Sequence, residues 1–315
     1  MAPAVTGADD ASIPDLGPLG IWSFHLDVQP MARAREAAAE LDELGFGSLW
    51  VPEAVAREPF ANAALLLGAT ARMTVATGIA SLHARSAMTM NAGWHTLSEA
   101  FPGRFLLGVG VSHQTLVEGV HQGQYSEKPY SAMAAYLDRM DAGVFMGASP
   151  AGAPTRVLAA LGPRMLRLAA ERGVGAHTYF VPVEHTAVAR AALGNTALLV
   201  PAITAVFETD PGVARRTARA FMARYLELPN YTNNLRRLGW GEEDLSAGGS
   251  DRLVDAIVAW GSLEQIAARV QGHLDAGADH VCVQVHNTDT RHLPLDEWRQ
   301  LASIASSLRT SSVAI

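Results

Sequence analysis

Three places in the chain repeat one pattern, in which an amphipathic helix ends in glycine, a short turn follows, and a continuous apolar run comes next. These places are ELDELGFGSLWVPE (40–53), LAAERGVGAHTYFV (168–181) and HLDAGADHVCVQV (273–285). Gly45, Gly173 and Gly277 stand where a helix commonly ends with a left-handed C′ residue. The apolar runs are too continuous for strands with one face in water, so each predicts a strand of a buried parallel sheet.

Further strands and helices fill the chain between these joints. The additional strands are expected at 20–24, 73–81, 105–111, 155–161 and 196–207. Helices are expected at about 30–44, 59–71, 84–100, 131–146, 163–172, 184–193, 211–226, 251–259, 262–276 and 294–308. Such alternation leaves an open doubly wound sheet or a closed (β/α)₈ TIM barrel. Eight similar units without a break in composition favour the barrel, as one domain over 16–315.

Two segments do not fit the repeating unit. The first is an N-terminal stretch, 1–15, which we expect to be a mobile tail. The second is LPNYTNNLRRLGWGEEDLSAGGS (228–250), a polar, aromatic and glycine-rich excursion. It is equally well interpreted as a surface excursion or as a lid or subunit contact.

The composition excludes several classes of protein. The 315 residues are 49% hydrophobic and carry a net charge of −7, so there is no basic footprint for nucleic acid and no sign of a membrane partner. The N-terminus lacks the pattern of a secretory signal, and no apolar run reaches about 18 residues. Cys282 is the only cysteine, which excludes an intramolecular disulfide. We expect a cytoplasmic protein that acts on a small molecule.

The stretch LLGVGVSH (106–113) runs from a buried strand into two glycines, a hydroxyl and an imidazole. It lacks the third glycine of a dinucleotide-binding loop, and the following HQTLVEGVHQGQYSEKPY is interpreted as a loop rather than a helix. In a barrel these residues lie at the mouth of the fourth strand. Gly110 would let a ligand approach, Ser112 could donate a hydrogen bond, and His113 could exchange a proton, unless the segment is a plain strand end.

A helix start at ALGPRM (160–165) predicts an anion site. Gly162 turns the chain and Pro163 takes the first helical position, where its missing N–H is not needed. The free amides of Arg164 and Met165 would then face the barrel mouth together with the positive end of the helix dipole, unless this is a helix start without a ligand.

Other polar or glycine positions could also reach the mouth. Gly78 interrupts a β-branched strand, which indicates a bulge or a close backbone approach by a flat ring. Glu53 closes the second strand, while His83, His177 and His286 lie at or near strand ends and could equally be structural. His95, inside a helix, is expected to pack against a neighbour. The pair His25 and Asp27 provides too few ligands for a metal, and no metal site is predicted.

Longer motifs resemble a known family over about residues 19–308. The runs MTVATGIASLHARSAMTMNAGWHTLSEAFPGRFLLGVGVSH and VLAALGPRMLRLAAERGVGAH, with LPNYTNNLRRLG and GGSDRLVDAIVAWG, resemble the bacterial luciferase-like superfamily. The resemblance is strongest to its coenzyme F420-dependent oxidoreductases of actinobacterial type. It implies an oxidoreductase that transfers a hydride between the deazaflavin and a small organic substrate.

The resemblance also implies where a cofactor would bind. In the family, a strand-three bulge with a non-prolyl cis peptide contacts the deazaflavin ring, and Gly78-Ile79 occupies that position. The strand-four end, Val111, Ser112 and His113, matches residues beside the ring and its tail. The family segment that runs along the cofactor matches Ala160, Leu161, Gly162, Pro163, Arg164 and Met165, and His177 is taken as a further contact.

One departure from the family limits what carries over. Sugar-phosphate dehydrogenases of the superfamily have an Asp-His pair after strand two, but here the pair is Glu53-Ala54, and His113 replaces a strand-four carboxylate. We therefore expect His113 to move the proton and Glu53 to orient the ring or substrate.

Three other functions stay open at this point. The protein could be an FMN-dependent monooxygenase, a non-catalytic flavin carrier, or, least of all, a metal-dependent hydrolase. The family also pairs through helices beside strands two and three, so we expect a homodimer in which Met88, Met90 and Trp94 could take part.

Overall fold

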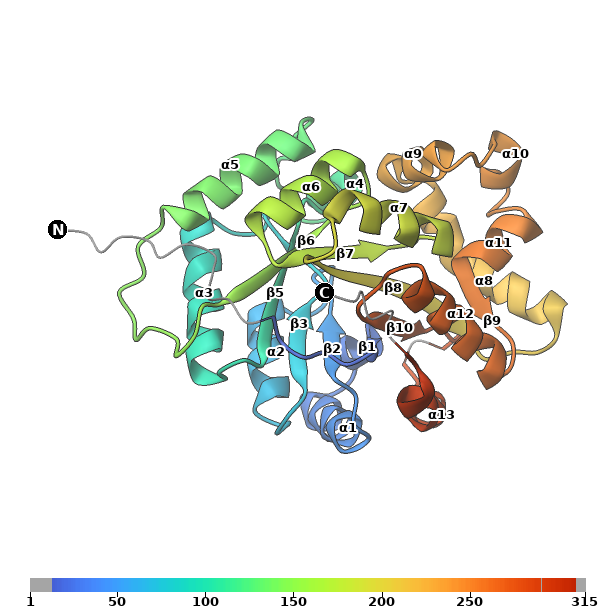
Figure 1. The fold of residues 1–315 in the computed structure, drawn as a ribbon, viewed down its shortest axis with the longest axis horizontal. Helices are drawn as coiled ribbons and strands as arrows, with labels where there is room; N and C mark the ends of the chain where they lie inside the picture. Colours follow the sequence, from blue (N-terminus) through green and yellow to red (C-terminus); the bar gives the residue numbers. More distant parts are fainter. Residues whose placement is uncertain (1–12, 290, 310–315) are drawn as a thin grey trace.

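A closed barrel of parallel strands forms the centre of the computed structural model, which describes residues 13–289 and 291–309 (Figure 1). Within these residues the barrel strands, in the order β10-β1-β2-β3-β5-β6-β7-β8, close when β10 pairs with β8. Their bounds are β1 (Leu19–Trp22), β2 (Ser48–Val51), β3 (Thr74–Thr77), β5 (Phe105–Gly110), β6 (Thr155–Ala159), β7 (Gly175–Tyr179), β8 (Leu198–Val206) and β10 (Val281–Val285). The predicted TIM barrel is confirmed. Most of the predicted tail, 1–15, lies outside the described residues.

Helices surround the barrel, as Figure 1 shows. The long ones are α1 (Met31–Glu43), α2 (Pro59–Leu67), α3 (Ala87–Ala100), α5 (Pro129–Asp141), α6 (Pro163–Arg172), α7 (Val183–Leu193), α8 (Pro211–Leu226), α12 (Leu263–Asp275) and α13 (Leu295–Ile304). Short 3₁₀ turns are η2 (His25–Val28) and η3 (Ala305–Ser307). Several helices begin at a side-chain cap, such as Asp210, whose carboxylate accepts the backbone N–H of Val213.

The glycine that ends each repeated helix does not always play the predicted role. Gly45 and Gly277 have φ values of +88° and +101°, which confirms left-handed helix ends in two of the three joints. Gly173 is different, because its backbone is extended with φ −145°. A Cβ on Gly173 would stand 2.8 Å from the carbonyl oxygen of Arg156, so close packing explains this glycine.

Alternate strand residues build two separate apolar layers. Ile21, Leu49 and Val75 pack with the helices in the outer layer. Trp22, Trp50 and others of the opposite parity form an inner cluster inside the barrel. A closed parallel barrel buries both faces of every strand, which is why the apolar runs in the sequence are continuous.

The strand predicted at 73–81 is broken in the middle. β3 ends at Thr77, the Gly78–Ile79 peptide bond is cis, and a two-residue strand, β4 (Ala80–Ser81), resumes the pairing with β5. Periodicity alone cannot show such a bulge, although the glycine within the strand indicated one.

The excursion at 228–250 is helical, contrary to its irregular composition. It contains α9 (Pro229–Arg237) and α10 (Glu242–Leu245), which pack with α8 and α11 (Asp251–Ile257). Tyr231 and Leu235 of α9 are buried in a cluster with Phe221 of α8. The excursion is therefore an integral part of the molecule rather than a loose surface insertion.

Two local predictions were wrong. The segment after LLGVGVSH opens a short helix, α4 (Gln114–Val117), because the carbonyl of His113 accepts the N–H groups of Leu116 and Val117. The helix predicted at 251–259 ends at Ile257, where a three-residue strand, β9 (Val258–Trp260), pairs with β8. In both segments a local hydrogen bond or a strand neighbour outweighs the sequence pattern.

Gly108 provides a test of this packing. The Thr77 hydroxyl donates to the Gly108 carbonyl at 2.8 Å and accepts its N–H at 2.9 Å, and a Cβ on Gly108 would overlap the Thr77 carbonyl oxygen. We expect Gly108→Ala to lower the free energy of unfolding by about 1–3 kcal/mol or more, measured by urea denaturation. Gly152→Ala is the control, since nothing lies within 4 Å of its Cβ position. Equal midpoints for the two variants would contradict the packing described.

Candidate functional site

The predicted site residues gather at one end of the barrel because every barrel strand runs in the same direction. Glu53, Gly78 and Ile79, His113 and the segment 160–165 all follow the carboxyl ends of strands or lie at them. In parallel barrels this end carries the active site. His177 lies one layer deeper, within β7 and inside the barrel.

The bulge at Gly78 brings three elements together inside the barrel. The indole N–H of Trp22 donates to the Gly78 carbonyl at 3.1 Å. A Cβ on Gly78 would stand 2.6 Å from Trp22 Nε1 and 3.4 Å from His177 Nε2. Only glycine therefore lets the backbone of the bulge pack this closely against Trp22 and face His177.

Ile79 occupies the space that Gly110 was expected to leave for a ligand. A Cβ on Gly110 would stand 2.5 Å from Ile79 Cδ1 and 3.1 Å from the Ala159 Cβ. A Cβ on Gly108 would likewise contact Ile79 at 3.4 Å. The prediction that a ligand approaches at Gly110 is therefore wrong, because these two glycines of β5 make room for the Ile79 side chain. They allow close packing.

His177 presents a buried hydrogen-bond acceptor that has no partner. Its ring stacks on Trp50 with centroids 4.4 Å apart, and its Nδ1 lies 3.0 Å from the Val200 carbonyl oxygen. Since a carbonyl only accepts, Nδ1 carries the proton and Nε2 carries the lone pair. Burial lowers the pKa of His177 to about 4, so the ring is neutral at pH 7. Nε2 is buried without a hydrogen bond to any described residue, and it faces Gly78.

An aromatic wall next to His177 escaped the sequence analysis. The Tyr179 ring lies 5.5 Å from the Trp22 ring, and its hydroxyl donates to Gln284 Oε1 at 2.6 Å. Tyr225 must then donate to Tyr179 across the 3.0 Å contact between the two hydroxyls. Burial raises the pKa of Tyr179 well above its ordinary value, which keeps this donor chain protonated. Strand parity could have indicated Tyr179, because it is two residues after His177 and shares its face.

His113 lies against the excursion rather than in open solvent. Its ring centroid is 5.4 Å from that of Tyr231, and the side chain of Asn230 hydrogen-bonds to it. Burial lowers the pKa of His113, and its hydrogen bond to the Asn230 side chain opposes this shift. Ser112, just before it, has a left-handed backbone with φ +57°. The imidazole is thus neutral near pH 7 and is held by α9.

Glu53 is engaged by neighbouring groups. Its carboxylate forms a close ion pair with Arg85, and both side chains are 9% exposed. The same carboxylate accepts the Ser81 N–H of β4 at 2.6 Å. Glu53 therefore holds the segment that follows the bulge, and its charge is largely neutralised by Arg85.

The β6–α6 joint has the form predicted for an anion site. Gly162 caps α6 without a side-chain hydrogen bond, and Pro163 is the first helical residue. The first amides of a helix have no partner within it. The Arg164 side chain turns away, since its guanidinium lies 4.3 Å from the centroid of the Tyr130 ring. Leu161 presents its carbonyl to His185 Nε2 at 2.9 Å.

The remaining histidines lie in separate places. His83 Nε2 is buried without a partner and the ring lies 5.1 Å from Tyr125, while His286 packs at 5.2 Å from Phe221. His95 stacks on Phe145, as expected. His25 Nε2 bonds to Asn287 Oδ1 at 3.0 Å, whereas Asp27 accepts from Asn62, so the two side chains bind different partners. Over residues 13–289 and 291–309 no group of three histidine, cysteine or carboxylate side chains has the arrangement of a metal site.

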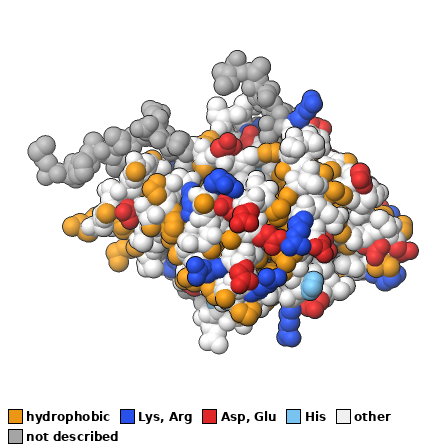
Figure 2. Space-filling model, turned by 90° about the horizontal axis from the view of Figure 1, so that it is seen from below, with side chains coloured by type: hydrophobic (Ala, Val, Ile, Leu, Met, Phe, Trp, Pro, Cys, Tyr) orange, Lys and Arg blue, Asp and Glu red, His pale blue; other side chains and the backbone are white. Residues whose placement is uncertain are grey.

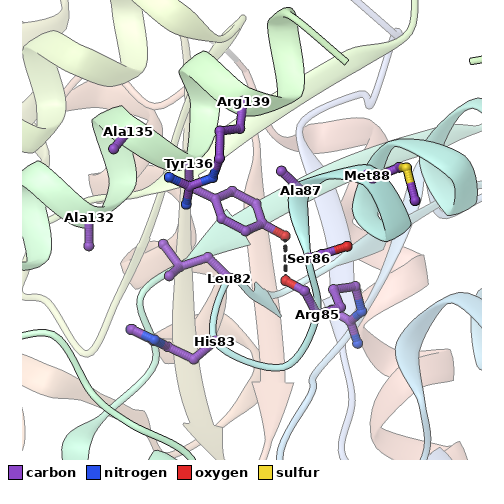
Figure 3. Close-up of a pocket in the computed structure, with 10 residues that line it drawn as sticks. All are labelled: Leu82, His83, Arg85, Ser86, Ala87, Met88, Ala132, Ala135, Tyr136 and Arg139. Carbon is purple, nitrogen blue, oxygen red and sulfur yellow. Dashed lines mark hydrogen bonds between the residues drawn. The ribbon is translucent and has the colours of Figure 1, made fainter. Parts of the chain in front are cut away.

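An open hollow of about 600 Å³ lies between the loop before α3 and helix α5 (Figure 3). Its wall includes Arg85, whose carbonyl accepts the Tyr136 hydroxyl at 2.9 Å. Of the predicted site residues only His83 lines it. The hollow adjoins the mouth at Arg85, which pairs with Glu53.

The surface gives little support to the predicted subunit contact. Met88 is 70% exposed, but Met90 and Trp94 are 0% and 8% exposed. Trp94 donates its indole N–H to the Thr155 carbonyl within the same chain, so neither Met90 nor Trp94 is available to a second copy.

Figure 2 shows acidic and basic side chains interspersed on one face of the molecule. No helix among the described residues is long and apolar enough to span a membrane.

The architecture with these groups at its mouth defines a TIM-barrel enzyme, and comparison with known proteins specifies the class. The model of the luciferase-like monooxygenase family matches residues 17–280. The chain belongs to this family and is an oxidoreductase of it.

One relative agrees with the assignment to this family. Rv3520c of Mycobacterium tuberculosis, provisionally named a coenzyme F420-dependent oxidoreductase, is 30% identical over 120 residues, which are 38% of this chain and 33% of that protein. The match thus spans about a third of the relative's length.

Two solved structures share the fold. An F420-dependent secondary alcohol dehydrogenase, in complex with an F420–acetone adduct, superposes with a TM-score of 0.75 at 14% identity, over 93% of this chain and 99% of that one. The oxygenating constituent of 3,6-diketocamphane monooxygenase of Pseudomonas putida, in complex with FMN, gives a TM-score of 0.67 at 17% identity, over 93% and 98%. At these identities the likeness concerns the fold alone.

The buried neutral state of His177 predicts a pH dependence. Below its unfolded pKa of about 6.5 the unfolded chain binds a proton that the native ring, with a pKa of about 4, does not. The contribution of neutral His177 to the free energy of unfolding is thus fully present above pH 6.5 and is lost as the pH falls toward 4. Between these values we expect the unfolding free energy of His177→Gln to depend on pH less steeply than wild type, by about 1.4 kcal/mol per pH unit.

The measurement is urea denaturation at several pH values. His121→Gln, at an exposed histidine, should keep the wild-type slope. Parallel curves for wild type and His177→Gln would show that His177 titrates normally in the native protein.

Proposed function

We propose that the protein transfers a hydride between coenzyme F420 and a small organic substrate at the mouth of the barrel. The observation that carries this is the unpartnered lone pair of His177 Nε2, which faces the Gly78 bulge beside the Trp22 indole. A flat heterocycle that offers an N–H would satisfy this buried acceptor. The F420-linked relative and the fold of an F420-dependent dehydrogenase support the choice of deazaflavin.

The residues at the mouth fit such a cofactor at its ring and at a phosphate group. The bulge at Gly78-Ile79 would lie against the ring, with Val111 and Ser112 beside it. The segment from Ala160 to Met165 would follow the tail, and the free amides at the start of α6 suit a phosphate. When bound, a deazaflavin supplies a carbon centre that donates or accepts a hydride.

His113 is proposed to move the accompanying proton. It follows the end of β5, is neutral because burial lowers its pKa, and is positioned by Asn230 and Tyr231. Ala54 offers no acid or base, and Glu53 is paired with Arg85. Glu53 is therefore proposed to orient the loop after the bulge. In this scheme the chain binds and orients both reactants, excludes water and provides one imidazole.

Titration of the purified protein with F420 and, separately, with FMN tests the proposed cofactor. We expect F420 to bind with a change in its fluorescence and FMN to bind more weakly. Tight binding of FMN and none of F420 would favour an FMN-dependent monooxygenase instead. Binding of a cofactor with no turnover of any acceptor would favour a carrier.

His113→Gln tests the proton step. We expect it to slow oxidation of reduced F420 by a panel of carbonyl acceptors about 10²- to 10⁴-fold while leaving F420 affinity close to wild type. The control is His95→Gln, because His95 lies on α3 and packs on Phe145. Wild-type turnover in His113→Gln would remove His113 from the mechanism.

A further inference from the structure

Helix α9 of the excursion lies beside two strand ends of the barrel mouth. Its polar residues Asn230, Asn234 and Arg237 are spaced by four and three positions, so they share one face of the helix. Asn230 contacts His113 after β5, and Arg237 lies beside Gly162 after β6. The adjacent side of α9 packs through Tyr231 and Leu235 on the aromatic cluster of α8. The polar face of α9 thus borders the proposed path of the cofactor.

Arg237 is a cation without a counter-charge at the start of α6. Its Nη2 lies 3.4 Å from the position that a Cβ on Gly162 would occupy. The same nitrogen donates to Asn234 Oδ1 at 3.1 Å, and no carboxylate of a described residue lies within ion-pair distance. Its neighbour on the helix, Arg236, is bound by Glu242 instead. An acidic side chain is thus within reach of Arg236 on this helix, whereas Arg237 has none among the described residues.

Asn234 adds a second, independent sign of a ligand. The residue is 2% exposed, and its Nδ2 is buried with no hydrogen-bond partner among the described residues. The oxygen of this same amide holds Arg237 beside Gly162. A buried amide nitrogen of this kind is expected to have an acceptor.

Beside His185, whose buried Nδ1 has no hydrogen-bond partner among the described residues, this joint carries three kinds of donor. They are the guanidinium of Arg237, the amide nitrogen of Asn234, and the free backbone N–H groups at the positive end of α6. A phosphate oxygen accepts from each of them, and guanidinium groups bind phosphate through paired hydrogen bonds. A neutral ligand would leave the charge of Arg237 without a partner.

We propose that Arg237 and Asn234 of the excursion form, together with the start of α6, an anion subsite that holds the phosphate group of the cofactor. This rests on the proposed function, and it makes the excursion a part of the cofactor site. Arg237 then determines the preference for a phosphorylated flavin or deazaflavin over the same ring system without phosphate.

The test compares ligands with and without phosphate in wild type and Arg237→Gln. We expect the variant to bind F420 and FMN about 10- to 100-fold more weakly than wild type. Riboflavin and the deazaflavin chromophore without its phosphate should bind both proteins equally. Arg237→Lys should recover part of the loss, because it keeps the charge without the paired geometry.

Arg236→Gln is the matched control, since it removes an arginine from the same helix that is paired elsewhere. It should bind every ligand as wild type does. Equal affinities of Arg237→Gln and wild type for F420 and FMN would overturn the proposal, as would an equal loss for the phosphate-free ligands. Circular dichroism and urea midpoints of both variants establish that the fold is intact.

Inorganic phosphate separates this proposal from the proposed function. We expect ³¹P line broadening of phosphate by the wild-type protein and its loss in Arg237→Gln. If that result is found but no flavin or deazaflavin binds, the anion subsite stands and the cofactor assignment fails. If the cofactors bind and Arg237→Gln changes no affinity, the cofactor assignment stands and the anion subsite fails. If neither phosphate nor any cofactor binds, both are wrong.

Discussion

Closure of the barrel depends on β10, which pairs with β1 on one side and with β8 on the other. These hydrogen bonds join the two ends of the chain's sheet and leave no free edge among the barrel strands. Because every barrel strand runs in the same direction, all of them end at one mouth, although the residues that meet there are far apart in sequence. Trp22 near the start of the chain and Gln284 near its end both contact the same aromatic wall of Tyr179.

The polar groups inside the barrel differ in whether their hydrogen bonds are satisfied. Trp50 donates its indole N–H to Ser48 at 2.8 Å, and Ser48 bonds to His280 at 2.7 Å, so the polar groups below His177 satisfy one another. Above them His177 Nε2 has no partner. An orphaned buried acceptor reduces stability, and such groups are commonly found where a ligand completes the network.

Several features of the fold could be predicted because they depend on neighbours in sequence. The helix ends at Gly45 and Gly277, the start of α6 at Pro163 and the continuous strands follow from local backbone preference and burial. Gly173 shows the limit, because its role comes from the carbonyl of Arg156, seventeen residues earlier in the chain. The excursion was misjudged for the same reason. Its polar, glycine-rich composition hides a helix that is stabilised by Phe221 and other residues of α8.

The sequence by itself determined the parallel α/β architecture and the segments that form the mouth, since hydrophobic period and glycine placement are local properties. Only the tertiary structure decided what each mouth residue does. It pairs Glu53 with Arg85, fills the space at Gly110 with Ile79, and brings Arg237 to Gly162. These outcomes depend on contacts between distant segments, whose distances are fixed by how the barrel closes and not by the order of the residues.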